Sequence, residues 1–407
     1  MADPTSREIE SSELGARLQA ARKAARIKQE DAALAINVAR TTITAIEKGD
    51  RRVQASELVV LAQLYGKSLN ELVRAGVSSK PFAVQLRASL PANSPALETL
   101  EAYFAEFQSL AQDYAQLELL CKSPLPMRYP AERSVTGRVD VEELAEDVAN
   151  TERDRLGLGD GPIHRLRDVL EREVGLRIFC MELPSNISGM FIFDGELGGC
   201  IAVNAKHTIE RIRNSVAHEY AHFLTSRLHP SIDEHSRYER VPEQERFAHA
   251  FAPAFLMPPM GLRRRFNQIK DASGAFKISD LVSLADYYGT SIESLTRRLE
   301  SLKLLKRGTW ESVSIKGLRV SEARDYLQLH APSDSNDLLP PRFTVLASNA
   351  FEEGQITEGQ FARFIRRDVF EARRIHQAYR AEIARSGRML SDTEVGYSTS
   401  NTREIEG

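Results

Sequence analysis

The first eighty residues carry short apolar stripes with helical spacing. Between residues 13 and 76, apolar side chains recur every three or four positions, as on the buried face of a helix. Gly49 and Gly66 follow the third and fourth stripes, and Ser56 and Ser68 stand where helix N-caps are expected. The pattern predicts five short helices. We therefore expect a small all-α domain over 11–78.

The next fifty residues combine prolines with one long apolar stripe. The stretch 79–96 contains Pro81, Pro91 and Pro95, which indicates a hinge. Over 96–121, apolar residues alternate spacings of three and four, as in a heptad repeat. They are Leu100, Tyr103, Phe107, Leu110, Tyr114, Leu117 and Cys121. We predict a linker segment over 79–130 whose long helix either packs on its own chain or forms the seam of a homodimer.

From about residue 140 the periodicity alternates between that of helices and that of strands. The predicted strands are 176–181, 189–193 and 199–203. The predicted helices are 140–157, 163–174, 207–228 and 242–256, with two shorter ones over 278–303. This mixture predicts an α+β domain over 131–303. The chain is therefore expected to be multidomain.

The last hundred residues have a weaker pattern. A strand-like region near 310–330 precedes a Ser/Asp/Pro-rich stretch at 332–341 and a charged helix near 357–385. The final twenty residues are polar, and we expect them to be disordered. We find no internal repeat and predict a mostly helical region, 304–407, without an assigned role.

Charge and cysteine content narrow the class of protein. The net charge of the 407 residues is -3, whereas 11–78 holds 11 Lys/Arg against 7 Asp/Glu, or +4. A local basic domain of this kind favours a nucleic-acid partner. The three cysteines, Cys121, Cys180 and Cys200, have no CxxC spacing, which favours a reducing compartment. The polar start and the lack of long apolar runs predict a cytoplasmic protein without a signal peptide or membrane span.

The segment His218-Glu219-Tyr220-Ala221-His222 is an HExxH motif. Residues i and i+4 of a helix lie on one face, so both imidazoles can reach one metal ion. Glu219 would project beside them and polarise a metal-bound water. Apolar residues flank the motif, as the burial of an active-site helix requires. The sequence therefore predicts a metal centre with Glu219 as its catalytic residue.

A third ligand is expected on the following helix. Glu245 would complete a His2Glu set and leave the fourth position to water. His249 shares its helix face and is placed in the second shell, against a ligand. Other acidic or imidazole side chains of the region remain alternatives for the third ligand: Glu239, Glu243, His229 and His235.

The segments RIRNSVAHEYAHFL and EQERFAHAFAPAFLMPP resemble the ImmA/IrrE family of metallo-endopeptidases. The resemblance covers roughly 145–260. It implies a zincin-like fold, Zn²⁺ or another divalent ion such as Mn²⁺ held by His218, His222 and Glu245, and Glu219 as general base. It also implies cleavage of a repressor protein. By analogy with other proteases, we expect the strand 199–204 to be a substrate-pairing edge.

Residues 13–75 resemble the phage-repressor (XRE-type) helix-turn-helix, on the segments KQEDAALA and RTTITAIEKG. The third helix would then lie in the major groove of a double-stranded DNA operator. Gln29 suits a phosphate at the start of the second helix. Base contacts are expected from the start of the third helix, and phosphate contacts from the residues that follow it. The expected base readers are Arg40, Thr41, Thr44 and Ala45, and the expected phosphate contacts are Lys48, Arg51 and Arg52.

Together these motifs predict a DNA-binding regulator joined to a zinc-dependent endopeptidase. The enzyme would cleave a repressor, in cis or in trans, and a homodimer is expected on DNA. The alternative is a non-proteolytic repressor or antitoxin, whose peptidase-like domain only senses a metal, a ligand or a partner. The presence of both histidines and the glutamate of HExxH favours the enzyme.

Overall fold

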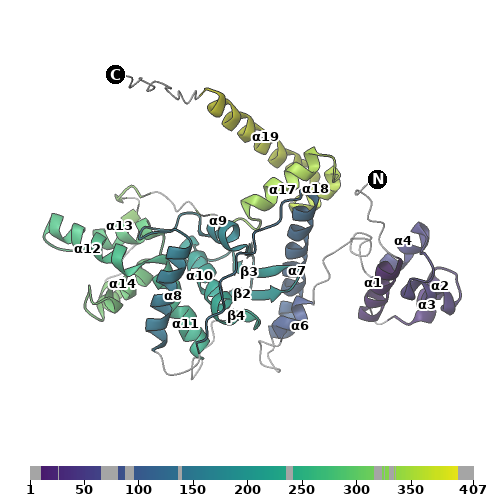
Figure 1. The fold of residues 1–407 in the computed structure, drawn as a ribbon, viewed down its shortest axis with the longest axis horizontal. Helices are drawn as coiled ribbons and strands as arrows, with labels where there is room; N and C mark the ends of the chain where they lie inside the picture. Colours follow the sequence, from purple (N-terminus) through teal and green to yellow (C-terminus); the bar gives the residue numbers. More distant parts are fainter. Residues whose placement is uncertain are drawn as a thin grey trace, which may run out of the picture. The chain divides into compact units, whose positions relative to one another are not determined.

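The computed structural model describes residues 11–25, 27–65, 81–87, 96–135, 140–234, 242–315, 323–324, 326–329, 334 and 336–392. The chain forms two compact units, Met1–Val77 and Ser78–Gly407 (Figure 1). The first is helical, and the second combines a four-stranded sheet with helices. This is the multidomain architecture that the sequence predicts. The finer boundaries at residues 130 and 303 lie within the second unit and stay predictions.

The first unit contains four described helices: α1 (Ser11–Ala24), α2 (Gln29–Ala35), α3 (Arg40–Lys48) and α4 (Ala55–Leu64). Its core holds the side chains of Leu18, Ala32, Ile43 and Leu61, which are almost fully buried. Gly49 ends α3 in the left-handed conformation (φ 82°), as the sequence predicts. Ser56 lies inside α4, whose N-cap is Gln54. The predicted fifth helix falls outside the described residues.

The second unit contains a mixed sheet with the order β1-β3-β2-β4. Its strands are β1 (Arg177–Met181), β2 (Ile187–Asp194), β3 (Gly198–Asn204) and β4 (Ser231–Glu234). β3 runs parallel to β1 and antiparallel to β2, so both of its edges are already paired. The prediction that 199–204 is a substrate-pairing edge is therefore wrong. β4 pairs with β2 and is the last strand of the described sheet.

Helices pack around this sheet and build the main core. α10 (Ile209–Thr225) contacts β2 and β3, and α11 (Glu243–Leu256) packs against both α10 and α8 (Val141–Arg155) (Figure 1). Their interface is aromatic: Tyr220, Phe223, Phe251 and Phe255 have almost no exposed surface. Each large apolar side chain buried in this way contributes about 1.5–3 kcal/mol to the stability of the packed helices. The packing fixes the two helices that carry the predicted metal ligands.

Further helices complete this part of the second unit. A helical turn, α9 (Leu166–Val169), continues into the π-helix η1 (Leu170–Val174). Three helices follow α11 in sequence: α12 (Pro259–Ser273), α13 (Ile278–Tyr288) and α14 (Ile292–Ser301). The sequence predicts the last two and misses α12, whose residues are largely polar.

The long helix α7 (Ala96–Leu120) packs within its own chain. Its stripe residues Phe107, Leu110 and Tyr114 are fully buried, in contact with the sheet and with neighbouring helices. Phe107 lies edge-on between Phe82 of α6 (Phe82–Arg87) and Phe179 of β1, with ring centroids 5.1 and 6.2 Å apart. The intramolecular alternative therefore holds, and this stripe is not a dimer seam. A homodimer through another surface stays a prediction.

The C-terminal region is helical. Its described helices are α15 (Thr309–Ile315), α17 (Pro341–Glu352), α18 (Glu358–Phe364) and α19 (Val369–Asp392). The prediction of a strand-like region near 310–330 is wrong where α15 covers it, and the remainder of 310–330 lies largely outside the described residues. α17 packs on α7 and joins this region to the second unit (Figure 1). No helix among the described residues is long and apolar enough to span a membrane.

Candidate metal centre and nucleic-acid interface

The HExxH residues lie on α10, and the predicted third ligand lies on α11. His218 and His222 are one helical turn apart, and their Nε2 atoms are 3.2 Å from each other. Glu245 reaches both: its Oε2 is 3.3 Å from Nε2 of His218, and its Oε1 is 3.4 Å from Nε2 of His222. The structure therefore brings together the three residues that the sequence singles out.

These distances fit a metal ion of zinc's size. Zinc binds imidazole nitrogen and carboxylate oxygen at about 2.0–2.2 Å, so the corners of a tetrahedral ligand set lie roughly 3.3–3.5 Å apart. The two histidine nitrogens lie 3.2 Å apart, and each lies 3.3 or 3.4 Å from a different oxygen of Glu245, close to that edge length. The competing carboxylate Glu243 is exposed, as is His229, whereas Glu239 and His235 fall outside the described residues. Geometry thus favours Glu245 as the third ligand.

The charges of the cluster also suit a cation. Burial lowers the pKa of His218, but its bond with Glu245 and the nearby carboxylates outweigh burial and raise that pKa to about 9. Burial raises the pKa of Glu245, yet the two histidines lower it overall to about 2. Burial, followed by the charge on His218, lowers the pKa of His222 to about 3. The cluster thus stabilises one positive charge at His218, which a bound cation would replace.

Glu219 is fully buried beside the cluster. Ser231 of β4 donates a hydrogen bond to its Oε2 over 2.9 Å, whereas Oε1 has no hydrogen-bond partner among the described residues. Burial raises the pKa of Glu219 to about 8, with His218 acting in the opposite direction. A buried carboxyl oxygen without a hydrogen-bond partner costs free energy unless another group, such as substrate or water, donates a hydrogen bond to it. One carboxylate oxygen is thus positioned by the protein and the other is open to chemistry.

Two further residues of the centre were not predicted as such. Asp233 of β4 offers a carboxylate oxygen close to His218 and Glu219, within 4.8 Å. Gly189 of β2 faces Glu219 so closely that a β-carbon there would meet its Oε1. Neither carries a motif in the sequence: β2 brings Gly189 to α10 by packing on that helix, and the pairing of β4 with β2 brings Asp233. His249, predicted in the second shell, lies against His218 with ring centroids 4.8 Å apart.

Polar groups anchor α10 from the side opposite the sheet. The hydroxyl of Tyr220 donates to Glu152 of α8 over 2.6 Å, and Arg155 pairs with the same carboxylate. Arg213 is buried and donates to the carbonyl oxygens of Gly289 and Ile163. These contacts make Arg213 a structural residue. They fix the helix that presents both histidines.

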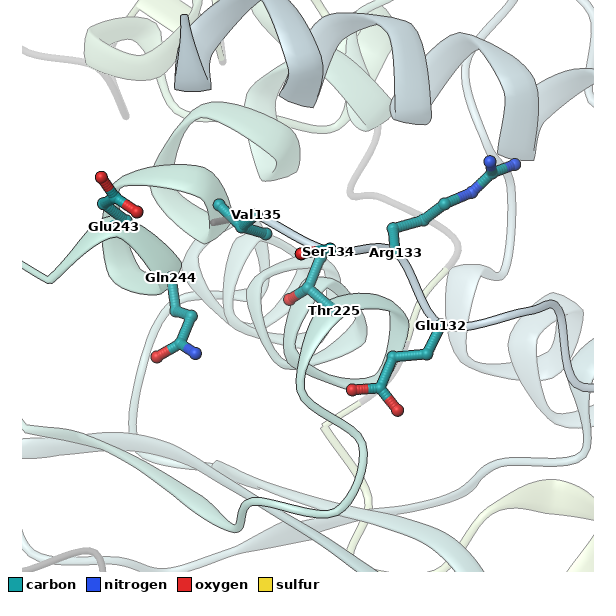
Figure 2. Close-up of a pocket in the computed structure, with 7 residues that line it drawn as sticks. All are labelled: Glu132, Arg133, Ser134, Val135, Thr225, Glu243 and Gln244. Carbon is teal, nitrogen blue, oxygen red and sulfur yellow. The ribbon is translucent and has the colours of Figure 1, made fainter. Parts of the chain in front are cut away.

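A separate cavity of about 490 Å³ lies where α10 ends and α11 begins (Figure 2). A chain segment after α7 forms one wall, and the N–H of Arg133 in that segment donates to the carbonyl of Leu224 over 2.8 Å. Among the described residues, its lining includes none of the three ligands and not Glu219. The lining residues are Glu132, Arg133, Ser134, Val135, Thr225, Glu243 and Gln244.

The predicted base-reading residues lie on α3 of the first unit. Arg40 and Thr41 are exposed, while Thr44 and Ala45 are half-buried. Arg40 has 64% of its side chain exposed and lies 3.7 Å from Glu30, a weak surface contact. Its guanidinium is therefore free to turn toward another partner. Lys48 and Arg52, predicted at phosphates, are exposed as well.

Two of the predicted DNA contacts also have partners within the unit. Gln29 donates from Nε2 to Glu47 over 2.9 Å, and Glu47 forms a buried ion pair with Arg22. Gln29 therefore helps to join α2 to α3. Arg51 forms a two-bond pair with Glu57 at 2.8 and 3.1 Å. Their contacts with DNA stay proposals.

Comparisons with known families agree with both resemblances. Residues 18–72 match the helix-turn-helix family model, and residues 171–300 match the peptidase M78 model, described as the IrrE N-terminal-like domain. The chain thus joins an XRE-type helix-turn-helix to an ImmA/IrrE-like domain. These matches support a DNA-binding regulator with a peptidase-like domain. No curated protein matches the chain.

Two solved structures are similar over most of the chain. ComR from Streptococcus suis is 11% identical, with 90% of this chain and 87% of that chain covered and a TM-score of 0.16. The apo form of ComR from S. thermophilus is 12% identical, with 78% and 95% covered and a TM-score of 0.15. TM-scores this low support no inference about this chain.

Proposed function

We propose that this regulator is also a zinc-dependent endopeptidase, which cleaves a repressor protein in cis or in trans and so switches gene expression. The observation that carries the proposal is the arrangement of His218, His222 and Glu245 at 3.2–3.4 Å, beside a buried Glu219. A binding module that only recognises a partner has no need of such a carboxylate.

Each side chain of the centre would have a distinct role. A divalent ion held by the three ligands would supply Lewis-acid activation of a water and of the scissile carbonyl. Glu219 is suited to move the proton: Oε1 accepts it from the attacking water and returns it to the leaving amine. Ser231 holds Oε2 of the same carboxylate and so orients the base. His249 would keep the ring of His218 in place from the outer side.

An extended substrate requires a strand edge near this centre. β4 suits this role because it is the last strand of the described sheet and carries Ser231, which touches Glu219. A peptide that pairs with β4 would place its carbonyls beside the ligands. We propose β4 as the substrate-pairing edge in place of β3.

The test is incubation of the zinc-loaded full chain with purified candidate repressor proteins, followed by intact mass measurement. The proposal predicts two complementary fragments of one repressor, or of the chain itself. A chain stripped of metal by a chelator should leave the same repressors intact, and readdition of zinc should restore cleavage. Intact masses in every sample would favour the alternative, a regulator whose peptidase-like domain only senses a metal, a ligand or a partner.

A further inference from the structure

The last helices of the chain repeat the geometry of the helix-turn-helix in the first unit. α2 and α18 are both seven residues long. Four residues connect α2 to α3, and four connect α18 to α19. A constant shift of 329 positions superposes the two motifs along the sequence, because α2 begins at residue 29 and α18 at residue 358.

The two turns have the same backbone conformation. The second connecting residue is left-handed in each case, with φ 54° at Asn37 and 56° at Arg366. The same conformation follows α7 at Lys122 and α14 at Lys303, so the likeness lies in its place between two helices and not in its rarity. The N–H of Asn37 donates to Leu34 O over 3.2 Å, and that of Arg366 donates to Arg363 O over 3.1 Å.

The equivalence continues on both sides of the turn. The N–H of Val38 donates to Ala33 O over 2.9 Å, and that of Arg367 donates to Ala362 O over 3.0 Å. Each first helix also begins with a capping box, in which a side chain three residues on accepts from the N-cap N–H. The pairs are Lys28 with Asp31 at 3.3 Å and Thr357 with Gln360 at 2.7 Å.

Some buried residues recur at matching positions of the two motifs. Ala33 and Ile43 are buried in the first motif, and the residues at the matching positions, Ala362 and Ala372, are buried in the second. In the first unit, α1 reaches the end of α3 through the pair Arg22–Glu47. At the same shift, Phe351 of α17 stacks edge-on against His376 of α19, with ring centroids 5.1 Å apart. A preceding helix thus contacts the last helix in both motifs, although α1 packs mainly on α3 and α17 mainly on α7 and α18.

Sequence comparison does not reveal this repeat. Only three of twenty positions are identical between 29–48 and 358–377, and the helix-turn-helix family match ends at residue 72. Identity is low because small buried residues in one motif are replaced by aromatic ones in the other. The correspondence is therefore one of backbone geometry, and the sequence itself shows no internal repeat.

The exposed face of α19 is basic. Residues 357–381 contain six arginines and three acids, a net charge of +3. Arg363 and Arg366 turn inward to the buried carboxylate of Asp113 on α7, which anchors the turn. The remaining four arginines point outward and pair only with partly or largely exposed carboxylates. They are Arg367, Arg373, Arg374 and Arg380, each with about half or more of its side chain exposed.

The positions predicted to read bases on α3 carry, on α19, groups that suit DNA. Arg373 and Arg374 stand where Thr44 and Ala45 stand in the first motif. Phe370, which is 82% exposed, takes the place of Thr41. Arginine pairs with guanine edges or phosphates, and an exposed phenylalanine can contact a thymine methyl. A large exposed aromatic residue within a basic face has no explanation in the packing of this chain.

We propose that residues 341–381 are a second helix-turn-helix and that α19 binds duplex DNA through Phe370, Arg373 and Arg374. The charge of the face selects nucleic acid over a basic or apolar protein partner. A chain with two such motifs would contact two sequence elements on one duplex.

The experiment selects duplexes from a randomised library with the full chain and then measures their binding to an R373A/R374A variant. Both side chains are at least half exposed, so we expect the variant to melt at the wild-type temperature. Its affinity should fall at least tenfold. The slope of log K against log salt should drop by about two, because each phosphate contact contributes roughly 0.9.

The matched control is R264A/R297A, which also removes two exposed arginines from surface ion pairs of the second unit. It should bind like wild type. R40A combined with R373A/R374A should show losses that add in log K, since the two motifs contact different base pairs. Wild-type affinity and salt slope in R373A/R374A would overturn the proposal. A change in its sedimentation at unchanged DNA affinity would also overturn it and assign the face to a protein contact.

Discussion

Gly189 and Glu219 touch so closely that no side chain fits between them. A β-carbon at position 189 would stand 2.5 Å from Oε1 of Glu219 and 3.0 Å from its Cγ. Both groups are buried, so neither can move aside into solvent. The glycine thus determines where the open oxygen of the proposed base lies.

Gly189→Ala should therefore displace Glu219 and leave the three ligands in place. We expect zinc content to stay near one per chain, while cleavage falls by on the order of 10²-fold or more, the usual contribution of a positioned base. Zinc analysis and intact mass of the products measure the two effects. Gly195→Ala is the control, because a β-carbon there meets nothing within 4 Å. Equal cleavage by both variants would show that Gly189 does not position Glu219.

The ligand set makes a prediction about metal content. Alanine at His218, His222 or Glu245 should each reduce bound zinc well below one per chain, because three protein ligands are needed for a stable catalytic site. Glu243→Ala, two residues from Glu245 but exposed, should keep it. Atomic absorption after dialysis measures the stoichiometry. Full zinc content in Glu245→Ala together with loss in Glu243→Ala would reverse the assignment of the third ligand.

The helix-turn-helix of the first unit makes a prediction about DNA. Arg40→Ala should weaken operator binding by about 1–3 kcal/mol and relax base preference at one position. Arg51→Ala should weaken binding to all duplexes alike. Because Arg51 also pairs with Glu57, Glu57→Gln is the control that breaks this pair and keeps the cation. Fluorescence anisotropy with specific and random duplexes measures each variant. Wild-type binding by both arginine variants would exclude this segment as the reader.

Burial of α7 changes what a substitution at Phe107 should do. An aspartate at this position would put a carboxylate among Phe82 and Phe179 and should prevent folding of the second unit. The milder Phe107→Ala should cost about 3–5 kcal/mol. Leu119 on the same helix is 66% exposed, so Leu119→Asp should leave stability nearly unchanged. Urea unfolding and sedimentation distinguish intramolecular packing of α7 from a dimer seam. A stable, monomeric Phe107→Asp variant would support the seam.

The sequence predicts the centre well because its main parts are local. His218, Glu219 and His222 lie within about one helical turn, so helical spacing alone places them together. The same spacing puts Glu245 and His249 on one face of the next helix. Gly189, Ser231 and Asp233 were missed because they come from β2, which packs on α10, and from β4, which pairs with β2. β4 is four residues long and largely polar, too short for a periodic signal.

Other differences have physical reasons of the same kind. The heptad stripe of α7 is the same pattern whether the partner is a second chain or the sheet beside it, so periodicity could not decide between them. Residues 309–315 include Trp310, Val313 and Ile315, which favour strands, yet they form α15 beside α14. The second helix-turn-helix is visible only in backbone geometry, because its core residues differ in size from those of the first.

We propose that one zinc centre cleaves a protein with Glu219 as its base. The most direct test compares the wild type with Glu219→Gln, both loaded with zinc and incubated with the same candidate repressors. Glutamine keeps the shape and the contact with Ser231 but cannot accept the proton. The account predicts equal zinc content, cleavage by the wild type and intact substrate with the variant, as read by intact mass. Equal cleavage by the two proteins, or none by a fully zinc-loaded wild type against every repressor and against itself, would contradict it.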